Sequence, residues 1–138
     1  MKDKMKTDCI FCKIIEGKIP SVKIWEDKKH LAILDINPAT KGHTLVIPKK
    51  HYETIFNMPK KLLKETIEVA QKIAKLLKEK LNAEGINLLN SNNKVAQQDV
   101  FHYHIHVIPR YSNEEFKIDF KNKTKNKNLS EVAKQIKQ

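Results

Sequence analysis

The stretch Phe101-His102-Tyr103-His104-Ile105-His106-Val107-Ile108-Pro109-Arg110 decides how this chain is interpreted. It holds three of the six histidines, at every second position, with bulky and mostly apolar residues between them. Strict alternation of this kind predicts a β-strand with one face against a core. Successive strand side chains point to opposite faces, so we expect the three imidazoles on one face, roughly 6.5–7 Å apart. Pro109 has no N–H for a sheet and is expected to end the strand.

Three histidines in register are harder to explain as ordinary surface than one. Close imidazoles repel each other once protonated, and they are unfavourable to bury without partners. Because perturbed titrating groups cluster at functional sites, the triplet predicts a site. Neutral imidazole is a nucleophile and a general acid or base near pH 7. One imidazole could attack phosphorus while a second protonates the leaving group, which splits one displacement into two easier steps.

Length and composition restrict the class of protein. A chain of 138 residues predicts one domain with a core of its own. The net charge is +11, but the lysines are spread along a helix and a tail without interleaved aromatic residues. We therefore interpret the charge as solvation and expect no specific nucleic-acid partner. The chain has no apolar run of about 18 residues, so no membrane span is expected.

The cellular compartment follows from the cysteines and the N-terminus. Lys13 and Glu16 interrupt the early apolar run, so no signal peptide is predicted. Two cysteines do not make a disulfide framework. We expect a protein of the reducing cytoplasm.

The rest of the chain predicts an α+β domain with a mostly antiparallel sheet. Four further strands are expected over residues 22–26, 30–34, 43–47 and 86–90. A short helix over residues 9–16 follows Asp8, and a long helix over residues 59–83 follows Asn57 and ends before Gly85. The long helix has one apolar stripe, formed by Leu63, Ile67, Ala70, Ala74, Leu77 and Leu81.

We divide the chain into three parts. Residues 1–8 are expected to be a flexible N-terminus and residues 9–112 the folded domain. Residues 113–138 are expected to be a Lys/Asn-rich linker and a last helix, with Asn128 and Glu131 forming a capping box.

Cys9-Ile10-Phe11-Cys12 is a C-x-x-C motif with two interpretations. A redox motif needs a thioredoxin-like βαβ context, which the pattern does not predict. Half of a zinc site needs two further ligands, for which His51 and one histidine of the strand are candidates.

Several motifs together resemble the histidine triad (HIT) superfamily. The stretch 102–108 is similar to its signature of three histidines separated by apolar residues. Further similar segments are Cys9 to Ile15, Asp35-Ile36-Asn37-Pro38, Lys41 to Lys49 and Leu88-Leu89-Asn90. The resemblance covers residues 9 to about 111. It is strongest to the bacterial-type, zinc-carrying HIT proteins of the nucleoside phosphoramidase-like branch.

The resemblance implies a HIT-like fold and roles for the histidines. The fold is a five-stranded antiparallel sheet with one long helix and one or two short ones, forming a homodimer. His104, the middle histidine, would be the nucleophile that forms a nucleotidyl-histidine. His106 would contact the phosphate and the leaving group, and His43 would support both histidines.

The resemblance also implies substrate contacts, with one departure. Asp35 would hold the ribose hydroxyls, and Asn90 and Gln98 would hold the ribose–phosphate region. Many relatives have Gly-Gln-Ser or Gly-Gln-Thr before the strand, whereas this chain has Gln97-Gln98-Asp99. The carboxylate of Asp99 replaces a small hydroxyl beside the phosphate, and like charge there is expected to weaken nucleotide binding.

In zinc-carrying members, the metal ligands match Cys9, Cys12, His51 and His102. Four protein ligands leave no open position, and a closed tetrahedral zinc site is structural. We therefore expect one structural zinc per chain, with His104 free of the metal.

These observations predict a hydrolase that binds a purine nucleotide and cleaves at the α-phosphorus of an AMP amide or ester. Three alternatives stay open. They are a dinucleoside polyphosphate hydrolase, a non-catalytic nucleotide-binding module, and a zinc-dependent hydrolase with His102, His104 and His106 as ligands.

Overall fold

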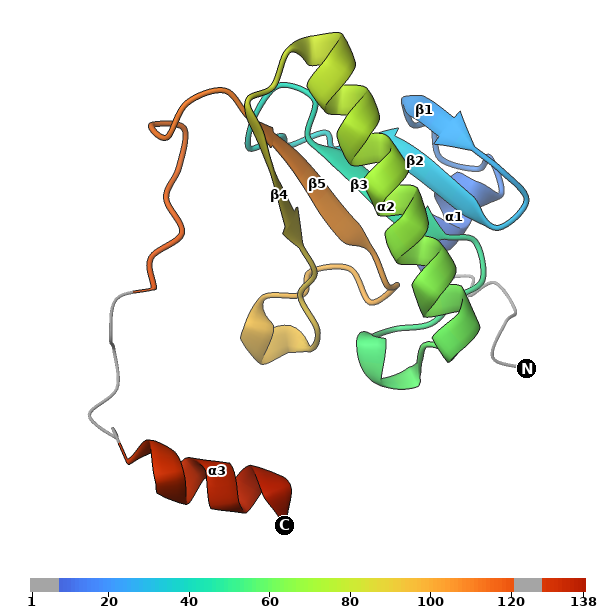
Figure 1. The fold of residues 1–138 in the computed structure, drawn as a ribbon. Coiled ribbons are helices and arrows are strands. Elements are labelled where there is room, and N and C mark those ends of the chain that lie inside the picture. The colour runs from blue at the N-terminus through green and yellow to red at the C-terminus, as the bar shows by residue number, and fades with distance from the viewer. Residues whose placement is uncertain (1–7, 121–127) are drawn as a thin grey trace.

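The computed structural model describes residues 8–120 and 128–138 (Figure 1). The expected flexible segment before Asp8 and much of the expected linker lie outside the described residues. No described helix is long and apolar enough to cross a membrane.

One antiparallel sheet of five strands forms the centre of the fold, in the order β1-β2-β3-β5-β4. The strands are β1 (Lys23–Glu26), β2 (His30–Leu34), β3 (Thr44–Pro48), β4 (Gly85–Leu89) and β5 (Ile105–Arg110). The predicted fold class is confirmed. β5 lies inside the sheet, between β3 and β4, so whatever precedes it enters the middle of the molecule.

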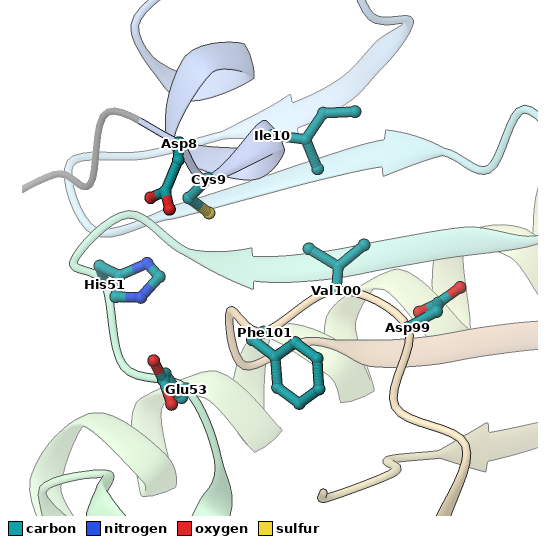
Figure 2. A pocket seen from close by; sticks show the side chains of 8 residues that line it. All are labelled: Asp8, Cys9, Ile10, His51, Glu53, Asp99, Val100 and Phe101. Atoms are coloured by element: carbon teal, nitrogen blue, oxygen red, sulfur yellow. The ribbon is translucent and has the colours of Figure 1, made fainter. Parts of the chain in front are cut away.

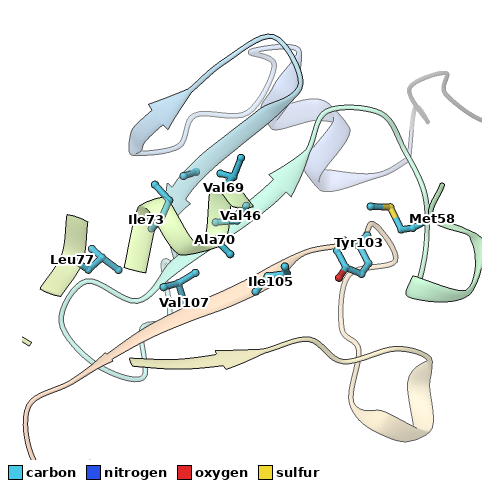
Figure 3. Packing of buried hydrophobic residues seen from close by; sticks show 10 residues of the cluster. Val46, Met58, Val69, Ala70, Ile73, Leu77, Tyr103, Ile105 and Val107 are labelled. Atoms are coloured by element: carbon cyan, nitrogen blue, oxygen red, sulfur yellow. The ribbon is translucent and has the colours of Figure 1, made fainter. Parts of the chain in front are cut away.

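The long helix α2 (Lys60–Leu81) crosses one face of the sheet (Figure 1). Its buried residues are Thr66, Val69, Ala70, Ile73 and Leu77. The apolar ones among them pack with Val46, Tyr103, Ile105 and Val107 in one cluster (Figure 3). The predicted stripe is wrong at Ile67, which is 47% exposed, because the buried face is rotated toward Thr66, Val69 and Ile73.

A second apolar cluster covers the opposite face, under the short helix α1 (Ile10–Ile15). Phe11, Cys12 and Ile14 of α1 pack there. The sheet contributes Leu31, Ile33, Leu45 and Ile47. β2 and β3 are therefore buried on both faces, which explains their continuous apolar runs.

The strand predicted over residues 101–108 is wrong at both ends. β5 begins only at Ile105 and continues through Pro109 to Arg110. β3 pairs with Ile105 to Val107 alone, so Pro109 lies beyond that ladder and its missing N–H is tolerated there. Pro48 likewise belongs to the end of β3, opposite His30.

The helix ends differ from the expected ones. Cys9, and not Asp8, caps α1 by accepting a hydrogen bond from the Cys12 N–H at its Sγ. α2 has Pro59 before its first turn, whereas Asn57 belongs to the 3₁₀ helix η1 (Ile55–Asn57).

The ends of the later helices give one correction and one confirmation. Asn82 ends α2 in the left-handed conformation, and Gly85 begins β4. For the last helix, α3 (Leu129–Lys137), the Asn128 half of the predicted capping box is confirmed, since its side chain accepts from the Glu131 N–H.

Candidate active site and metal centre

The three alternating histidines do not share one strand face. Residues 101–104 precede β5, so His102 and His104 lie on irregular backbone and only His106 lies on the strand. His102 contacts two cysteines, His104 lies against the edge of Phe11, and His106 contacts His43. The three imidazoles therefore have three different surroundings, which does not fit a metal site made of these three residues.

A backbone hydrogen bond sets the tautomer of His104. Its Nδ1 lies 2.7 Å from the carbonyl oxygen of His102, and a carbonyl can only accept, so Nδ1 carries the proton. The lone pair of the neutral ring is then on Nε2. Asn90 fixes the same backbone from the other side by donating to the carbonyl of His104, at 2.9 Å.

A second hydrogen-bond chain orients His106. The Ala39 N–H donates to Nδ1 of His43 at 2.9 Å, which makes that nitrogen the acceptor. Nε2 of His43 therefore carries the proton and donates to Nδ1 of His106, also at 2.9 Å. This leaves a proton on Nε2 of His106, so that ring presents a donor where His104 presents a lone pair. The backbone amide of Ala39 could not be identified from sequence, because no side-chain pattern marks it.

Burial keeps these imidazoles neutral. It lowers the pKa of His104 from the ordinary value, and it lowers the pKa of His43 as well. The pKa of His106 falls to about 4, chiefly through burial, with His104 and His43 adding repulsion. The site thus holds uncharged rings at neutral pH, as a nucleophile and a neutral donor require.

Asp35 lies at the end of β2, beside the hydrogen-bonded histidines His43 and His106. One carboxylate oxygen accepts from the Asn37 N–H at 2.8 Å, and the other lies 3.6 Å from Nε2 of His43. The structure therefore brings Asp35, His43 and His106 together.

The two predicted amides are used to organise the loop before β5. The buried Gln98 accepts from the Asn93 N–H and donates both of its own N–H groups, to the carbonyls of Glu53 and Val100. The Asn90 side-chain oxygen accepts from the side chain of Asn92, at 2.6 Å.

Asp99 is the charged group beside the nucleophile candidate. Its Oδ1 lies 3.9 Å from Nε2 of His104, and its side chain is 80% exposed. The loop held by Gln98 thus presents a carboxylate at the position where the resemblance implies a hydroxyl.

Cys9, Cys12, His51 and His102 form a candidate metal centre. Their ligand atoms all lie within 4.8 Å of one another. Nδ1 of His102 is 3.4 Å from Sγ of Cys9 and 3.6 Å from Sγ of Cys12. Nδ1 of His51 is 3.4 Å from Sγ of Cys12 and 3.1 Å from Nδ1 of His102.

The donor set fits a tetrahedral zinc ion. Metal bonds of the usual length at tetrahedral angles place donor atoms roughly 3.3–3.8 Å apart, which is close to the observed spacings. Nε2 of His102 donates to the carbonyl of Pro48 at 2.7 Å, so its Nδ1 lone pair faces the cluster. Burial lowers the pKa of His102 to about 4, which keeps the ring in its neutral, metal-binding form.

A cavity of about 300 Å³ lies between this cluster and Asp99 (Figure 2). Its lining residues are Asp8, Cys9, Ile10, His51, Glu53, Asp99, Val100 and Phe101. Figure 2 shows Asp99 toward one end and Asp8 with His51 toward the other, with Val100 and Phe101 between them. The sequence motifs did not mark this space, because its walls come from three distant segments.

Comparison with known proteins agrees with the geometry. The HIT domain family model matches residues 16–113. An uncharacterized HIT-like protein of Methanocaldococcus jannaschii is 50% identical over 129 residues, which cover 94% of this chain and 98% of that protein. An adenosine 5'-monophosphoramidase of Candida albicans is 43% identical over 106 residues, covering 74% and 70%.

A crystal structure of a Zn-bound histidine triad family protein from Mycobacterium smegmatis superimposes with a TM-score of 0.76. The two are 37% identical, and the match covers 94% of this chain and 96% of that one. The family model alone spans well over half of the chain, and the M. jannaschii relative is matched over nearly its whole length. The chain therefore belongs to the HIT domain family.

Proposed function

We propose that this protein hydrolyses AMP amides or esters through a nucleotidyl-histidine intermediate on His104. The observation that carries the proposal is the tautomer of His104, whose Nδ1–H bonds to the His102 carbonyl and whose Nε2 keeps the lone pair. The similarity to the C. albicans adenosine 5'-monophosphoramidase supports the phosphoramidate as first substrate.

In the first step, Nε2 of His104 attacks the α-phosphorus and the N–P bond forms. The P–N bond to the leaving amine breaks, and the amine departs with the electron pair and takes up a proton from water. The neutral His106 donates from Nε2 to a phosphoryl oxygen and stabilises the charge that gathers there. In the second step, water attacks phosphorus, the bond to His104 breaks, and AMP and a proton are released.

The other predicted residues have narrower proposed roles. We propose Asp35 for the ribose hydroxyls, because it is held at the end of β2 beside His43. Asn90 and Gln98 act by holding the backbone of His104 and of the loop, since Asn90 donates to the His104 carbonyl and Gln98 donates both of its N–H groups to carbonyls. Their contact with the ribose–phosphate region would then be made by the loop that they position.

A trapping experiment tests the proposal. The protein is mixed with an adenosine phosphoramidate, quenched in denaturant, and weighed intact by mass spectrometry. We expect one adenylyl adduct, and peptide mapping should place it on His104. Turnover without any adduct, and lost on chelation, would favour a metal hydrolase. Binding of AMP without turnover would favour the non-catalytic module, and turnover of diadenosine polyphosphates alone would favour the polyphosphate alternative.

We also propose one structural zinc per chain, held by Cys9, Cys12, His51 and His102. The zinc would tie α1 to the segment before β5. Its role would be structural, since four protein ligands leave no position for water. The Zn-bound M. smegmatis structure supports this metal for the site. Two thiols that must stay reduced to bind it also support the cytoplasm as the compartment.

The homodimer is a further proposal. β4 is an edge strand, and Leu88 and Leu89 on it are about half-exposed. An exposed edge with apolar side chains is a surface that another chain can cover. The folded domain proposed over residues 9–112 contains this edge and every residue of the site. The proposed ligands are a purine nucleotide and a second copy, with no specific nucleic acid and no membrane.

A further inference from the structure

The cavity beside Asp99 combines acidic and apolar walls in a strongly basic protein. Asp8, Glu53 and Asp99 contribute carboxylates, and Ile10, Val100 and Phe101 contribute apolar surface (Figure 2). The chain as a whole carries a net charge of +11. An acidic lining is therefore opposite in sign to the rest of the molecule, and it would repel a phosphate or a nucleotide tail.

One wall residue of the cavity, Asp99, also borders the nitrogen proposed to react. Its Oδ1 lies 3.9 Å from Nε2 of His104. The His104 side chain is only 5% exposed, and among the described residues its Nε2 has no hydrogen-bond partner. Although the ring is largely covered, its Nε2 is not among the buried polar atoms, so a ligand atom can approach it beside Asp99. Any group joined to a phosphorus held at Nε2 is within a few bonds of the cavity.

We propose that this cavity receives the leaving group of the reaction and selects organic amines that carry a positive charge of their own. The inference rests on the proposed function. A volume of about 300 Å³ is at the lower end of small-molecule sites, which fits a short alkyl chain. An alkyl chain would lie on Ile10, Val100 and Phe101, and its ammonium group would lie among the carboxylates.

A positive charge on the leaving amine would give the carboxylate of Asp99 a function in substrate selection. The P–N bond breaks with its electron pair going to the leaving nitrogen, and the distal ammonium takes no part in that step. Asp99 is therefore a specificity residue for the part of the substrate that leaves. Because its side chain is largely exposed, the expected preference is modest, about fivefold for one ion pair at low salt.

Two substrates of matched size test the inference. One is the adenosine 5'-phosphoramidate of n-butylamine, and the other is that of 1,3-diaminopropane, in which an ammonium replaces the terminal methyl. We expect kcat/KM to be about fivefold higher for the cationic compound. Asp99→Asn should remove most of that preference, raising kcat/KM for the neutral compound and lowering it for the cationic one. Added salt should reduce the preference in the wild type, as it screens an exposed pair.

Binding separates this inference from the proposed function. Dissociation constants for both compounds are measured calorimetrically with His104→Ala, which removes the nucleophile. Tighter binding of the cationic compound supports the leaving-group site even if the wild type hydrolyses neither compound, a result that would overturn the proposed function alone. Equal binding and equal kcat/KM for the two compounds would overturn the inference while leaving the hydrolase intact.

A control variant and a second wall residue complete the design. Glu79→Gln removes an exposed carboxylate on α2, outside the cavity, and should leave the preference unchanged. Glu53→Gln should reduce the preference less than Asp99→Asn, because Glu53 does not border His104. A loss of preference as large in Glu79→Gln as in Asp99→Asn would show a general charge effect and overturn the assignment to this cavity.

Discussion

Single hydrogen bonds decide what each histidine of the triplet can do. The His102 carbonyl leaves the lone pair of His104 on Nε2, as the proposed nucleophile requires, and the hydrogen bonds from Ala39 through His43 leave a proton on Nε2 of His106. The same residue type therefore serves two opposite purposes within 5.0 Å, measured between the ring centroids of His104 and His106. Both roles require neutral rings, which burial provides.

Replacing the nucleophile should abolish the reaction. His104→Ala is expected to lower kcat by several orders of magnitude, because a covalent nucleophile has no nearby substitute. AMP binding by calorimetry and the circular dichroism spectrum serve as controls and should be close to wild type. Activity within tenfold of wild type would correspond to only about 1.4 kcal/mol of barrier and would contradict the assignment.

The pH profile should extend further into acid than an ordinary histidine permits. The groups that face His106 are His104, His43, Asp35 and Asp99, and its pKa is lowered to about 4. Burial lowers the pKa of His104 as well, so we expect kcat/KM to be kept as the pH falls through 6.5 and to decline only at lower pH. The measurement is kcat/KM between pH 4 and 8, corrected for the uncatalysed reaction. A decline centred on pH 6.5 would contradict the lowered pKa values of His104 and His106.

Acid unfolding must be followed in the same series. The folded pKa of His106 lies below the unfolded value, so the unfolded chain binds more protons between pH 6.5 and about 4. The free energy of unfolding therefore decreases as the pH falls through that window. Circular dichroism at each pH identifies the range in which a change in rate reports on the site and not on unfolding.

At the level of the elements, α1 depends on contacts far away in the sequence. Six residues are too few for a helix to be stable alone. It is held by its apolar face on β2 and β3 and by Cys9 and Cys12, which meet residues about 40 and 90 positions later. A metal at that point would join α1 to the segment that carries His104.

Removing the proposed metal should destabilise the fold more than it affects the chemistry directly. Cys9→Ser with Cys12→Ser should bind no zinc by elemental analysis and should melt well below the wild type, because structural zinc contributes folding free energy. Activity should fall only indirectly, to the extent that α1 loses its packing on the sheet. An anomalous scattering peak at the zinc edge, in crystals with AMP, decides the position. A peak contacting His104 or the phosphate would contradict a structural role.

The helix α2 offers a direct test of which face is buried. Ile73→Ala should lower the free energy of unfolding by about 2–5 kcal/mol, because it leaves a cavity at a fully buried position. Ile67→Ala is the matched control on the same helix, and its loss should be below about 1 kcal/mol at a half-exposed site. Denaturant titration of both variants measures the difference. Equal losses would mean that Ile67 is covered, as by a second copy of the chain.

For the molecule as a whole, the sheet has two free edges with different surfaces. β1 forms one edge and β4 the other, and β4 carries the half-exposed Leu88 and Leu89. β4 also pairs with β5, so an assembly at that edge would lie close to the strand that carries His106.

Light scattering with size exclusion tests the proposed dimer. We expect twice the chain mass of 16.1 kDa for the wild type. Leu88→Lys with Leu89→Lys should shift the protein toward the monomer, because burying lysine without a partner is unfavourable. Val22→Lys, an exposed apolar position next to β1, is the control and should leave the mass unchanged. A monomeric wild type would contradict the proposal.

Local sequence patterns were sufficient to predict much of the secondary structure and the fold class of this protein. Alternation and helical spacing were sufficient for the α+β class, the four other strands, the long helix and the cap at Asn128. The motifs also identified the family and the residues that gather around the histidines. These features depend on residues a few positions apart, so the sequence displays them directly.

Other features were decided only by the tertiary structure. Alternation predicted that the three histidines share one strand face. However, β5 begins only at Ile105, because His102 in the preceding segment contacts Cys9 and donates to the carbonyl of Pro48. The tautomer of His104, the chain from Ala39 to His106, and the cavity beside Asp99 all depend on backbone groups or on segments far apart in the chain. Periodicity describes which side of an element is apolar. It does not contain the distances between elements, and those distances set burial, proton positions and the shape of the site.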